Sequence, residues 1–218
     1  MSKTAVVIGA TGLIGNALLK QLLADERYAR IIVLARRNTG LESEKLEELT
    51  GDLLDQDFWK SIPRVQAEDV FCCIGTTRAK TSDMQEYKNI DYGIPLQAAH
   101  WGLKNGLQKF VVISSIGADK NSRVFYTRTK GQMEEALRKL SIPRLYILRP
   151  SVLMGHRNEF RFGEAVGKIL TKAFSWLLPG RYKGIKGQTV AQAMIILANS
   201  TSGQAVYESE EIRSLVEG

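Results

Sequence analysis

The sequence predicts an α/β protein of the Rossmann type, with a doubly wound parallel sheet and a small C-terminal cap. Short apolar runs alternate with segments of helical periodicity through the first 150 residues, which is the pattern of βαβ units. The runs are apolar at almost every position, as strands covered on both faces are. A glycine-rich turn follows the first run directly and leads into the first helical segment. These three observations favour a parallel sheet with helices on both faces.

The elements can be placed in order along the chain. Strands are predicted at residues 5–8, 30–35, 45–49, 69–74, 110–113 and 145–148. Helices are predicted at residues 13–23, 55–60, 84–103, 125–140, 163–178 and 189–199. After Pro150 the pattern changes, and glycine-punctuated basic segments replace the strands. We therefore expect a single domain over residues 1–218, with a core at residues 1–150 and a small substrate or cap region at residues 151–218.

The composition and net charge of the chain limit the kinds of molecule that it is expected to bind. The chain has 44% hydrophobic and 24% charged residues, and a net charge of +7. A positive excess of this kind suits nucleic acid, an anionic membrane surface or a phosphate-bearing ligand. No recognition-helix, zinc-finger or RNA-binding aromatic motif is found, so nucleic acid is not expected. No run of 18 apolar residues occurs, so no transmembrane segment is expected.

The two cysteines, Cys72 and Cys73, are adjacent within an apolar run. Neighbours on a strand point to opposite faces, so the pattern predicts two buried thiols rather than a disulfide, in a reducing compartment. With two histidines and two cysteines, no zinc-ligand spacing exists, and no metal is expected. The glycine-interrupted N-terminus does not resemble a signal peptide. We therefore expect a cytoplasmic protein.

The glycine-rich turn reads Gly9-Ala10-Thr11-Gly12-Leu13-Ile14-Gly15. The first glycine permits a tight turn, the second lets the backbone approach a pyrophosphate, and the third lets the helix pack near the sheet. The N–H groups at a helix start, with the helix dipole, favour phosphate charge. The spacing is GxxGxxG rather than the standard GxGxxG. Its position between a buried strand and a helix nevertheless predicts dinucleotide binding.

The residues after the next strands refine the choice of cofactor. Arg36 and Arg37 end the second strand, where NAD-binding proteins usually carry an acidic residue for the ribose hydroxyl. Two arginines favour the 2′-phosphate of NADP(H), because a guanidinium matches phosphate oxygens well. Asp52 follows the third strand, near the expected adenine, and a helix-capping role is an equal alternative. Gly75 and Thr76 follow the fourth strand, where a glycine permits close approach to the nicotinamide side.

A second motif indicates reaction chemistry. Tyr126 and Lys130 form Y-x-x-x-K in a helical pattern, so both side chains share one face. A nearby ammonium favours the phenolate, which would let Tyr126 exchange a proton with a substrate oxygen. The preceding strand ends in Ser114 and Ser115, and a hydroxyl there could orient a carbonyl. Ser115 is the preferred candidate, although the sequence alone does not decide which serine faces the site.

Taken together, these segments resemble the atypical short-chain dehydrogenases/reductases, and within them the group of the human Tat-interacting oxidoreductase-like protein and its bacterial relatives. The most specific strings are Phe71-Cys-Cys-Ile-Gly-Thr-Thr-Arg78 and Ser114-Ser-Ile-Gly-Ala-Asp-Lys120. The resemblance implies that Tyr126 transfers the proton and that NADPH is the cofactor. It also implies further cofactor contacts at Leu153 and Arg161, although Phe162 departs from the family pattern there.

The candidate sites follow from the residues and from this resemblance. The catalytic candidates are Tyr126, Lys130 and Ser115. The candidates for cofactor binding are Gly9, Ala10, Thr11, Gly12, Leu13, Ile14, Gly15, Arg36, Arg37, Asp52, Gly75, Thr76, Lys130, Leu153 and Arg161.

Two functions remain open at this stage. The first is an NADPH-dependent oxidoreductase acting on a small carbonyl or alcohol substrate. The second is an NADP(H)-binding regulatory protein with little turnover that acts through a protein partner. A homodimer is also compatible with the sequence. Residues 155–187 hold seven basic and two acidic residues, a local excess of five positive charges, so this part of the expected cap could attract an anionic substrate or partner.

Overall fold

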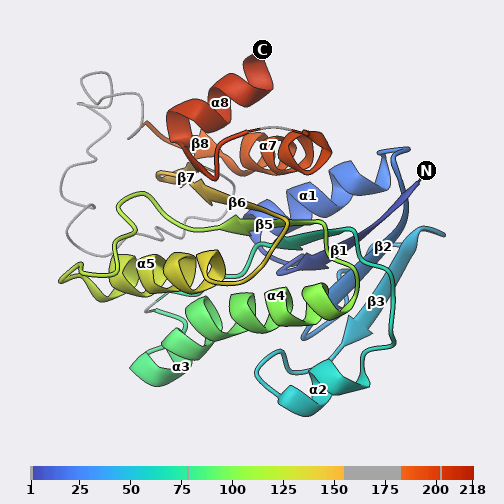
Figure 1. Cartoon of the computed structure of the whole chain (residues 1–218), viewed down its shortest axis with the longest axis horizontal. Helices are drawn as coiled ribbons and strands as arrows, with labels where there is room; N and C mark the ends of the chain where they lie inside the picture. The colour runs from blue at the N-terminus through green and yellow to red at the C-terminus, as the bar shows by residue number, and fades with distance from the viewer. Residues whose placement is uncertain (1, 78, 155–182, 202) are drawn as a thin grey trace.

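The computed structural model describes residues 2–77, 79–154, 183–201 and 203–218 (Figure 1). Its main sheet has seven strands in the order β3-β2-β1-β4-β5-β6-β9, and every neighbouring pair is parallel. The predicted Rossmann-type doubly wound sheet is confirmed. The strands are β1 (Lys3–Ile8), β2 (Tyr28–Ala35), β3 (Leu46–Thr50), β4 (Asp69–Cys72), β5 (Lys109–Ile113), β6 (Arg144–Arg149) and β9 (Val206–Glu208).

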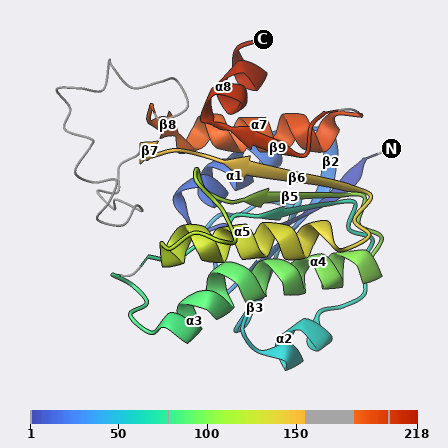
Figure 2. The ribbon, with the colours of Figure 1, turned by 60° about the vertical axis from the view of Figure 1, so that its left-hand side comes forward.

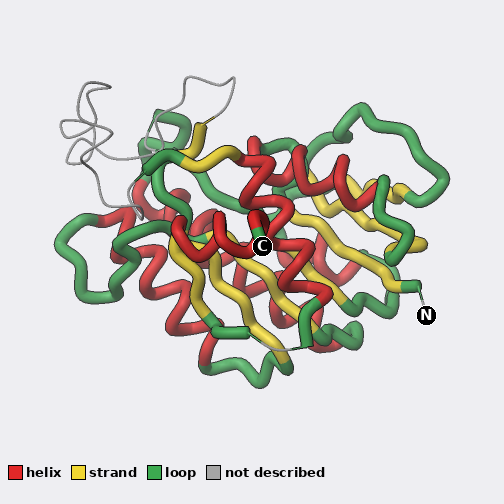
Figure 3. The backbone as a smooth tube through the Cα atoms, turned by 90° about the horizontal axis from the view of Figure 1, so that it is seen from above, coloured by secondary structure: helices red, strands yellow, loops and turns green. Residues whose placement is uncertain are grey.

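Helices cover both faces of this sheet (Figures 1 and 2). One face carries α1 (Leu13–Leu23), α7 (Gly187–Asn199) and α8 (Ser209–Glu217). The other face carries α2 (Gln56–Ser61), α4 (Ile94–Lys104) and α5 (Phe125–Arg138). Seen from above, the C-terminal helix lies over the strands (Figure 3). Among the described residues, no helix has both the length and the apolar content needed to cross a membrane.

The core consists of two apolar clusters, one on each face of the sheet. Successive side chains of a strand point to opposite faces, so Val7 joins the α1–α7 cluster while Val6 joins the α4–α5 cluster. This double burial is why the central strands are apolar at nearly every position. Cys72 and Cys73 are both buried thiols that form no disulfide within the described part of the chain, as predicted, and burial raises the pKa of Cys72 to about 11.

The predicted helix at residues 84–103 is divided into three parts. These are α3 (Met84–Lys88), a π-helical turn η1 (Asn89–Gly93) and α4, with Pro95 in the first turn of α4. Proline has no N–H and crowds the preceding turn, so it fits the first turn of a helix better than the interior of a long one. The strand predicted at 69–74 is also shorter in the structure, where β4 ends at Cys72.

The expected cap at residues 151–218 needs correction. Its described C-terminal part supplies the seventh strand of the main sheet, β9, and helices α7 and α8 of the main core. The cause is that Val190 and its apolar neighbours cover a face of the sheet that would otherwise be exposed. A separate two-stranded sheet pairs β7 (Leu153–Met154) with β8 (Ile185–Lys186). The predicted helix at 163–178 and the basic residues between 155 and 182 lie outside the described residues.

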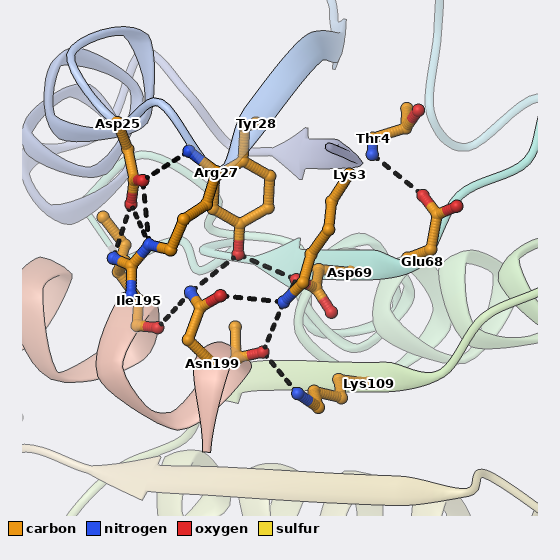
Figure 4. A network of polar contacts seen from close by, with 11 residues as sticks. Lys3, Thr4, Asp25, Arg27, Tyr28, Glu68, Asp69, Lys109, Ile195 and Asn199 are labelled. Carbon is orange, nitrogen blue, oxygen red and sulfur yellow. Dashed lines mark hydrogen bonds and ion pairs between the residues drawn. The ribbon is translucent and has the colours of Figure 1, made fainter. Parts of the chain in front are cut away.

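A polar network joins the start of the chain to the end of α7 at the N-terminal edge of the strands (Figure 4). Asp69, 1% exposed, accepts from the ammonium of Lys3 at 3.0 Å and from the hydroxyl of Tyr28 at 2.7 Å. Asn199, which ends α7, accepts from Lys3 at 2.8 Å and donates to Tyr28 at 3.2 Å. The network lies at the edge opposite the glycine-rich turn. It therefore fastens α7 to the sheet without entering the predicted site.

Candidate functional site

A cavity of about 630 Å³ opens at the carboxyl ends of β1 and β4. The strand order reverses between these two strands, and this is where ligands of open α/β sheets bind. The cavity brings together most of the predicted cofactor-binding residues. Those that line it are Gly9, Thr11, Gly12, Leu13, Arg36, Arg37, Asp52, Gly75, Thr76 and Leu153.

The glycine-rich turn packs closely against the end of β4. Gly9 has φ +85°, and a Cβ there would lie 2.8 Å from the carbonyl carbon of Cys73. A Cβ on Gly15 would lie 2.1 Å from the carbonyl oxygen of Gly9, so this glycine lets α1 pack on the turn. Gly12 precedes α1, and within the part of the chain that the structure describes no side chain caps that helix start. Its first N–H groups are therefore available to an anion.

Other predicted members of the turn do not line the cavity. Ala10 and Ile14 are buried in the apolar cluster beneath α1, where they support the turn. Gly15 serves packing, as described above. Arg161 lies outside the described residues.

The cationic wall comes from the end of β2. Arg36 and Arg37 are exposed side chains on the cavity lining. Within the described part of the chain, neither has a hydrogen-bond or ion-pair partner, which leaves both guanidinium groups for an anion. Asp52 lies on the same wall, where its carboxylate accepts from the N–H of Leu54 at 3.0 Å. The cap of α2 is Asp55, so Asp52 stabilises a turn instead of capping that helix.

The opposite wall is formed by the segment after β4. Gly75 and Thr76 lie there, and the Thr76 N–H donates to Asp91 Oδ2 at 2.8 Å. The Thr76 hydroxyl is 2.9 Å from that of Thr81, which also lines the cavity. This wall is therefore fixed by side chains from the following segment and from η1.

The three predicted catalytic residues are not among those that line the cavity. Tyr126 is half-buried in the first turn of α5, and Lys130 follows one turn later, 2% exposed. The Lys130 ammonium forms an ion pair with Asp91, with 2.9 Å between Nζ and Oδ1. Burial by itself would lower the pKa of Lys130, but Asp91 and, to a lesser extent, Tyr126 outweigh it and raise the pKa above its usual 10.5. Lys130 is thus held as a buried cation beside Tyr126.

The two serines at the end of β5 have different partners. The Ser114 hydroxyl donates to the buried carboxylate of Glu134 at 2.6 Å. The Ser115 hydroxyl donates to the carbonyl of Ile116 at 3.0 Å, in its own loop. Ser114 is therefore committed to the α5 side of the sheet. Among the described residues, Ser115 is thus the serine whose hydroxyl bonds a carbonyl of its own loop.

Sequence reasoning missed two buried acids near these residues. Asp91 and Glu134 are both fully buried. Asp91 falls on the apolar stripe that Tyr87, Ile94 and Ala98 form at helical spacing, and an acid on such a stripe was the available signal. Asn89, two residues earlier, is exposed and accepts from the side chain of Gln85 at 2.9 Å.

Comparison with known proteins agrees with this geometry. A family model described as the NAD-dependent epimerase/dehydratase family matches residues 5–181. The chain belongs to this family. Among curated proteins, the chain is similar to FMP52 of Eremothecium gossypii. The two are 31% identical over 97% of this chain and 96% of FMP52. HTATIP2 of Rattus norvegicus is 32% identical over 93% of this chain and 84% of its own.

Solved structures show the same fold. A short-chain dehydrogenase family protein from Francisella tularensis superposes with a TM-score of 0.70 at 19% identity, covering 94% of this chain and 96% of its own. MoeE5 in complex with UDP-glucose and NAD superposes with a TM-score of 0.66 at 18% identity, covering 98% of this chain and 81% of MoeE5. The predicted resemblance to atypical short-chain dehydrogenases/reductases, and to the Tat-interacting group, is thereby confirmed.

Family membership also settles some of the coarser expectations. A family described as NAD-dependent indicates a nicotinamide cofactor, and supports an enzymatic, oxidoreductase-like function. The expectation of a cytoplasmic protein is contradicted, because the FMP52 relatives are named as mitochondrial proteins. That expectation rested on an N-terminus without a signal-peptide pattern.

The residues present fit a dinucleotide. The cavity falls within the range of about 300–1,000 Å³ typical of small-ligand pockets. Gly9 and Gly12 bring bare backbone to its wall beside the uncapped start of α1. Arg36 and Arg37 supply cations at its far end. A pyrophosphate near the glycines would meet the backbone N–H groups at the start of α1. The adenine-side ribose, with any 2′-phosphate it carries, would lie near the two guanidinium groups.

Proposed function

We propose that this protein is an NADPH-dependent oxidoreductase of the atypical short-chain dehydrogenase/reductase type. Its substrate would be a small carbonyl compound or alcohol, with Tyr126 as proton donor or acceptor. When bound, the nicotinamide would supply or accept the hydride at the substrate carbon.

The preference for NADPH is carried by one observation. Arg36 and Arg37 line the same cavity as the glycine-rich turn, and neither has an acidic partner among the described residues. Asp52 shares the wall, but it is engaged with the N–H of Leu54. A 2′-phosphate would therefore meet two guanidinium groups, whereas a ribose hydroxyl would meet no carboxylate placed by β2.

The proton-transfer role of Tyr126 rests on its neighbour. Lys130 lies one turn further along α5, charged and buried. A fixed positive charge beside a phenol stabilises the phenolate that remains after the proton leaves. Ser115, at the end of β5, would orient the substrate oxygen, because Ser114 is committed to Glu134.

Replacing Tyr126 tests this proposal. Tyr126→Phe removes the hydroxyl and keeps the ring, so we expect turnover of any substrate to fall by about 10²–10⁴-fold. NADPH affinity, measured by fluorescence titration, should change by less than about twofold (about 0.4 kcal/mol). Carbonyl reduction is followed by NADPH absorbance across a panel of small aldehydes and ketones.

Tyr146→Phe is the matched control. Tyr146 lies in β6, and its buried hydroxyl has no hydrogen-bond partner among the described atoms. Its removal should leave both turnover and NADPH affinity unchanged. Loss of NADPH binding in the Tyr126 variant, or an equal loss of activity in the control, would contradict the assigned role.

A regulatory NADP(H)-binding protein is the second candidate. The observation that favours it is that Tyr126, Lys130 and Ser115 all lie outside the cavity lining. This candidate predicts tight NADPH binding with no reduction across the carbonyl panel. It also predicts that a protein partner is retained in stoichiometric amount only when NADPH is present. Turnover that depends on Tyr126 would exclude it.

A further inference from the structure

The carboxylate of Asp91 joins two parts of the site that the sequence treats separately. Asp91 is 0% exposed, and its two oxygens have different partners. Oδ2 accepts from the N–H of Thr76, on the cavity wall, at 2.8 Å. Oδ1 lies 2.9 Å from Nζ of Lys130, one turn from Tyr126. A single side chain therefore links the cofactor cavity to the Tyr126–Lys130 pair.

Lys130 is held from three sides. Besides Asp91, its ammonium donates to the carbonyls of Ile74 and Ile113, each at 3.3 Å. The carbonyl of Ile74 follows β4, and that of Ile113 ends β5. An ammonium has three N–H groups, and three acceptors surround it here. The position of the charge is thus set by the ends of two strands and by η1.

Only Asp91 among these partners carries a negative charge. Two neutral carbonyls do not offset the cost of removing an ammonium from water, whereas a carboxylate at ion-pair distance does. The other titratable groups facing Lys130 are Tyr126, on α5, and the thiol of Cys72, on β4. Both are weak acids that are neutral at pH 7 in their ordinary state. The charge of Lys130 therefore depends on Asp91.

Asp91 lies in the π-helical turn η1. This turn separates α3 from α4, and Asp91 is its central residue. Asp91 shares the apolar stripe of Tyr87 and Ile94 and, like them, is buried. Such single π-turns commonly occur at functional sites.

We propose that Asp91 is a positioning residue: it is the buried counter-ion that keeps Lys130 charged and fixed beside Tyr126, and it anchors that pair to Thr76 on the cavity wall. This inference rests on the proposed function where it concerns turnover. The ion pair itself can be tested without any substrate. Asp91 does not touch the substrate in this role; it acts through Lys130.

The first test compares Asp91→Asn, Lys130→Met and the double variant by urea unfolding between pH 6 and pH 10. In the wild type the raised pKa means that Lys130 stabilises the fold below about pH 10.5, and this stabilisation is lost as pH rises through the folded-state pKa. Without the carboxylate, burial becomes the dominant influence on Lys130 and lowers its pKa. Stability of Asp91→Asn should then rise with pH, by up to about tenfold in the unfolding equilibrium constant per pH unit.

The double variant isolates the part due to Lys130. With methionine at position 130, Asp91→Asn should give no additional pH slope and should recover most of the lost stability. If Asp91→Asn does not fold but the double variant does, the unpaired lysine is the cause and the proposal is supported. If both fail to fold, or if Asp91→Asn is equally harmful in both backgrounds, the defect does not pass through Lys130 and the proposal is overturned.

The second test measures binding and turnover of the folded variants. Asparagine keeps an acceptor for the Thr76 N–H, so NADPH affinity should change by less than about threefold (about 0.65 kcal/mol). Turnover should fall by at least about tenfold, and the ratio to wild type should decrease further as pH rises from 7 to 9, because Lys130 loses its proton. A ratio that is constant with pH would overturn the positioning role. If Tyr126→Phe leaves turnover unchanged, the proposed function fails, while the unfolding series still decides the ion pair.

Discussion

At the scale of single residues, the proposed preference for NADPH rests on Arg36 and Arg37. Both side chains are exposed on the cavity wall and have no partner among the described residues. A guanidinium gains from a phosphate because charge-assisted hydrogen bonds are stronger than neutral ones. The ribose hydroxyl of NADH offers no such charge.

We therefore expect Arg36→Ala/Arg37→Ala to weaken NADPH binding by at least about tenfold, or about 1.4 kcal/mol. NADH binding should change by less than about twofold, because NADH carries no phosphate at this position. Fluorescence titration of both cofactors measures the difference. Arg30→Ala is the matched control, since Arg30 is an exposed arginine of β2 that pairs with Glu47 away from the cavity. Equal affinities of the wild type for NADPH and NADH would refute the argument.

At the scale of elements, α5 connects the candidate catalytic residues to the ends of two strands. Glu134, on this helix, accepts from Ser114 at the end of β5. It also accepts from Arg149, which ends β6, at 2.8 Å, and the carboxylate raises the pKa of that arginine. A fully buried carboxylate with a hydroxyl and two arginine partners, the second being Arg138, is well compensated. The position of Tyr126 and Lys130 therefore depends on how α5 is held.

Gly131 gives this helix a close contact that can be broken selectively. A Cβ at Gly131 would lie 2.2 Å from the backbone nitrogen of Lys120, in the loop that follows β5. We expect Gly131→Ala to lower the free energy of unfolding by about 2–4 kcal/mol, because backbone atoms must move apart. Urea unfolding measures this change.

The control is the same substitution in the π-helical turn η1. A Cβ on Gly93, in η1, would meet nothing within 4 Å. Gly93→Ala should therefore be neutral or stabilise by up to about 1 kcal/mol, since alanine is the better helix former. Similar losses at Gly131 and Gly93 would contradict the contact described for Gly131.

At the scale of the whole molecule, the C-terminal segment completes the core. Helix α7 contacts α1 over the sheet, and β9 pairs with β6. Asn199 ties the end of α7 to Lys3 and Tyr28 near the N-terminus (Figure 4). A chain that ends at residue 150 would expose the apolar face under α7.

We accordingly expect residues 1–150 alone not to fold cooperatively. Removing α7 exposes side chains of β5 and β6 that are completely buried in the full chain, such as Val111 and Leu148. Each large side chain contributes about 1.5–3 kcal/mol when buried, so losing this layer exceeds the usual stability of a domain. Circular dichroism and urea unfolding of the fragment and the full chain test this. A sharp unfolding transition of the fragment would show that the core closes without α7.

The sequence by itself determined the features that depend on neighbours in the chain. The apolar runs of the central strands, the glycine-rich turn and the Tyr126–Lys130 spacing are local patterns, and the fold class followed from them. The observed helix boundaries differ from the predicted ones where a local rule was overlooked. Pro95 favours the first turn of a helix, and the predicted helix at 84–103 is accordingly divided before it. The nicotinamide cofactor then followed from the family.

Only the tertiary structure decided which residues share a site. Asp91 and Lys130 are distant in sequence, and their ion pair exists because η1 and α5 both pack at the ends of β4 and β5. The commitment of Ser114 to Glu134, and the place of α7 in the main core, are likewise long-range. A buried charge needs a partner because desolvation is costly, and the fold can supply that partner from any part of the chain. Sequence periodicity shows which face of an element is buried, but not which residue of another element it will meet.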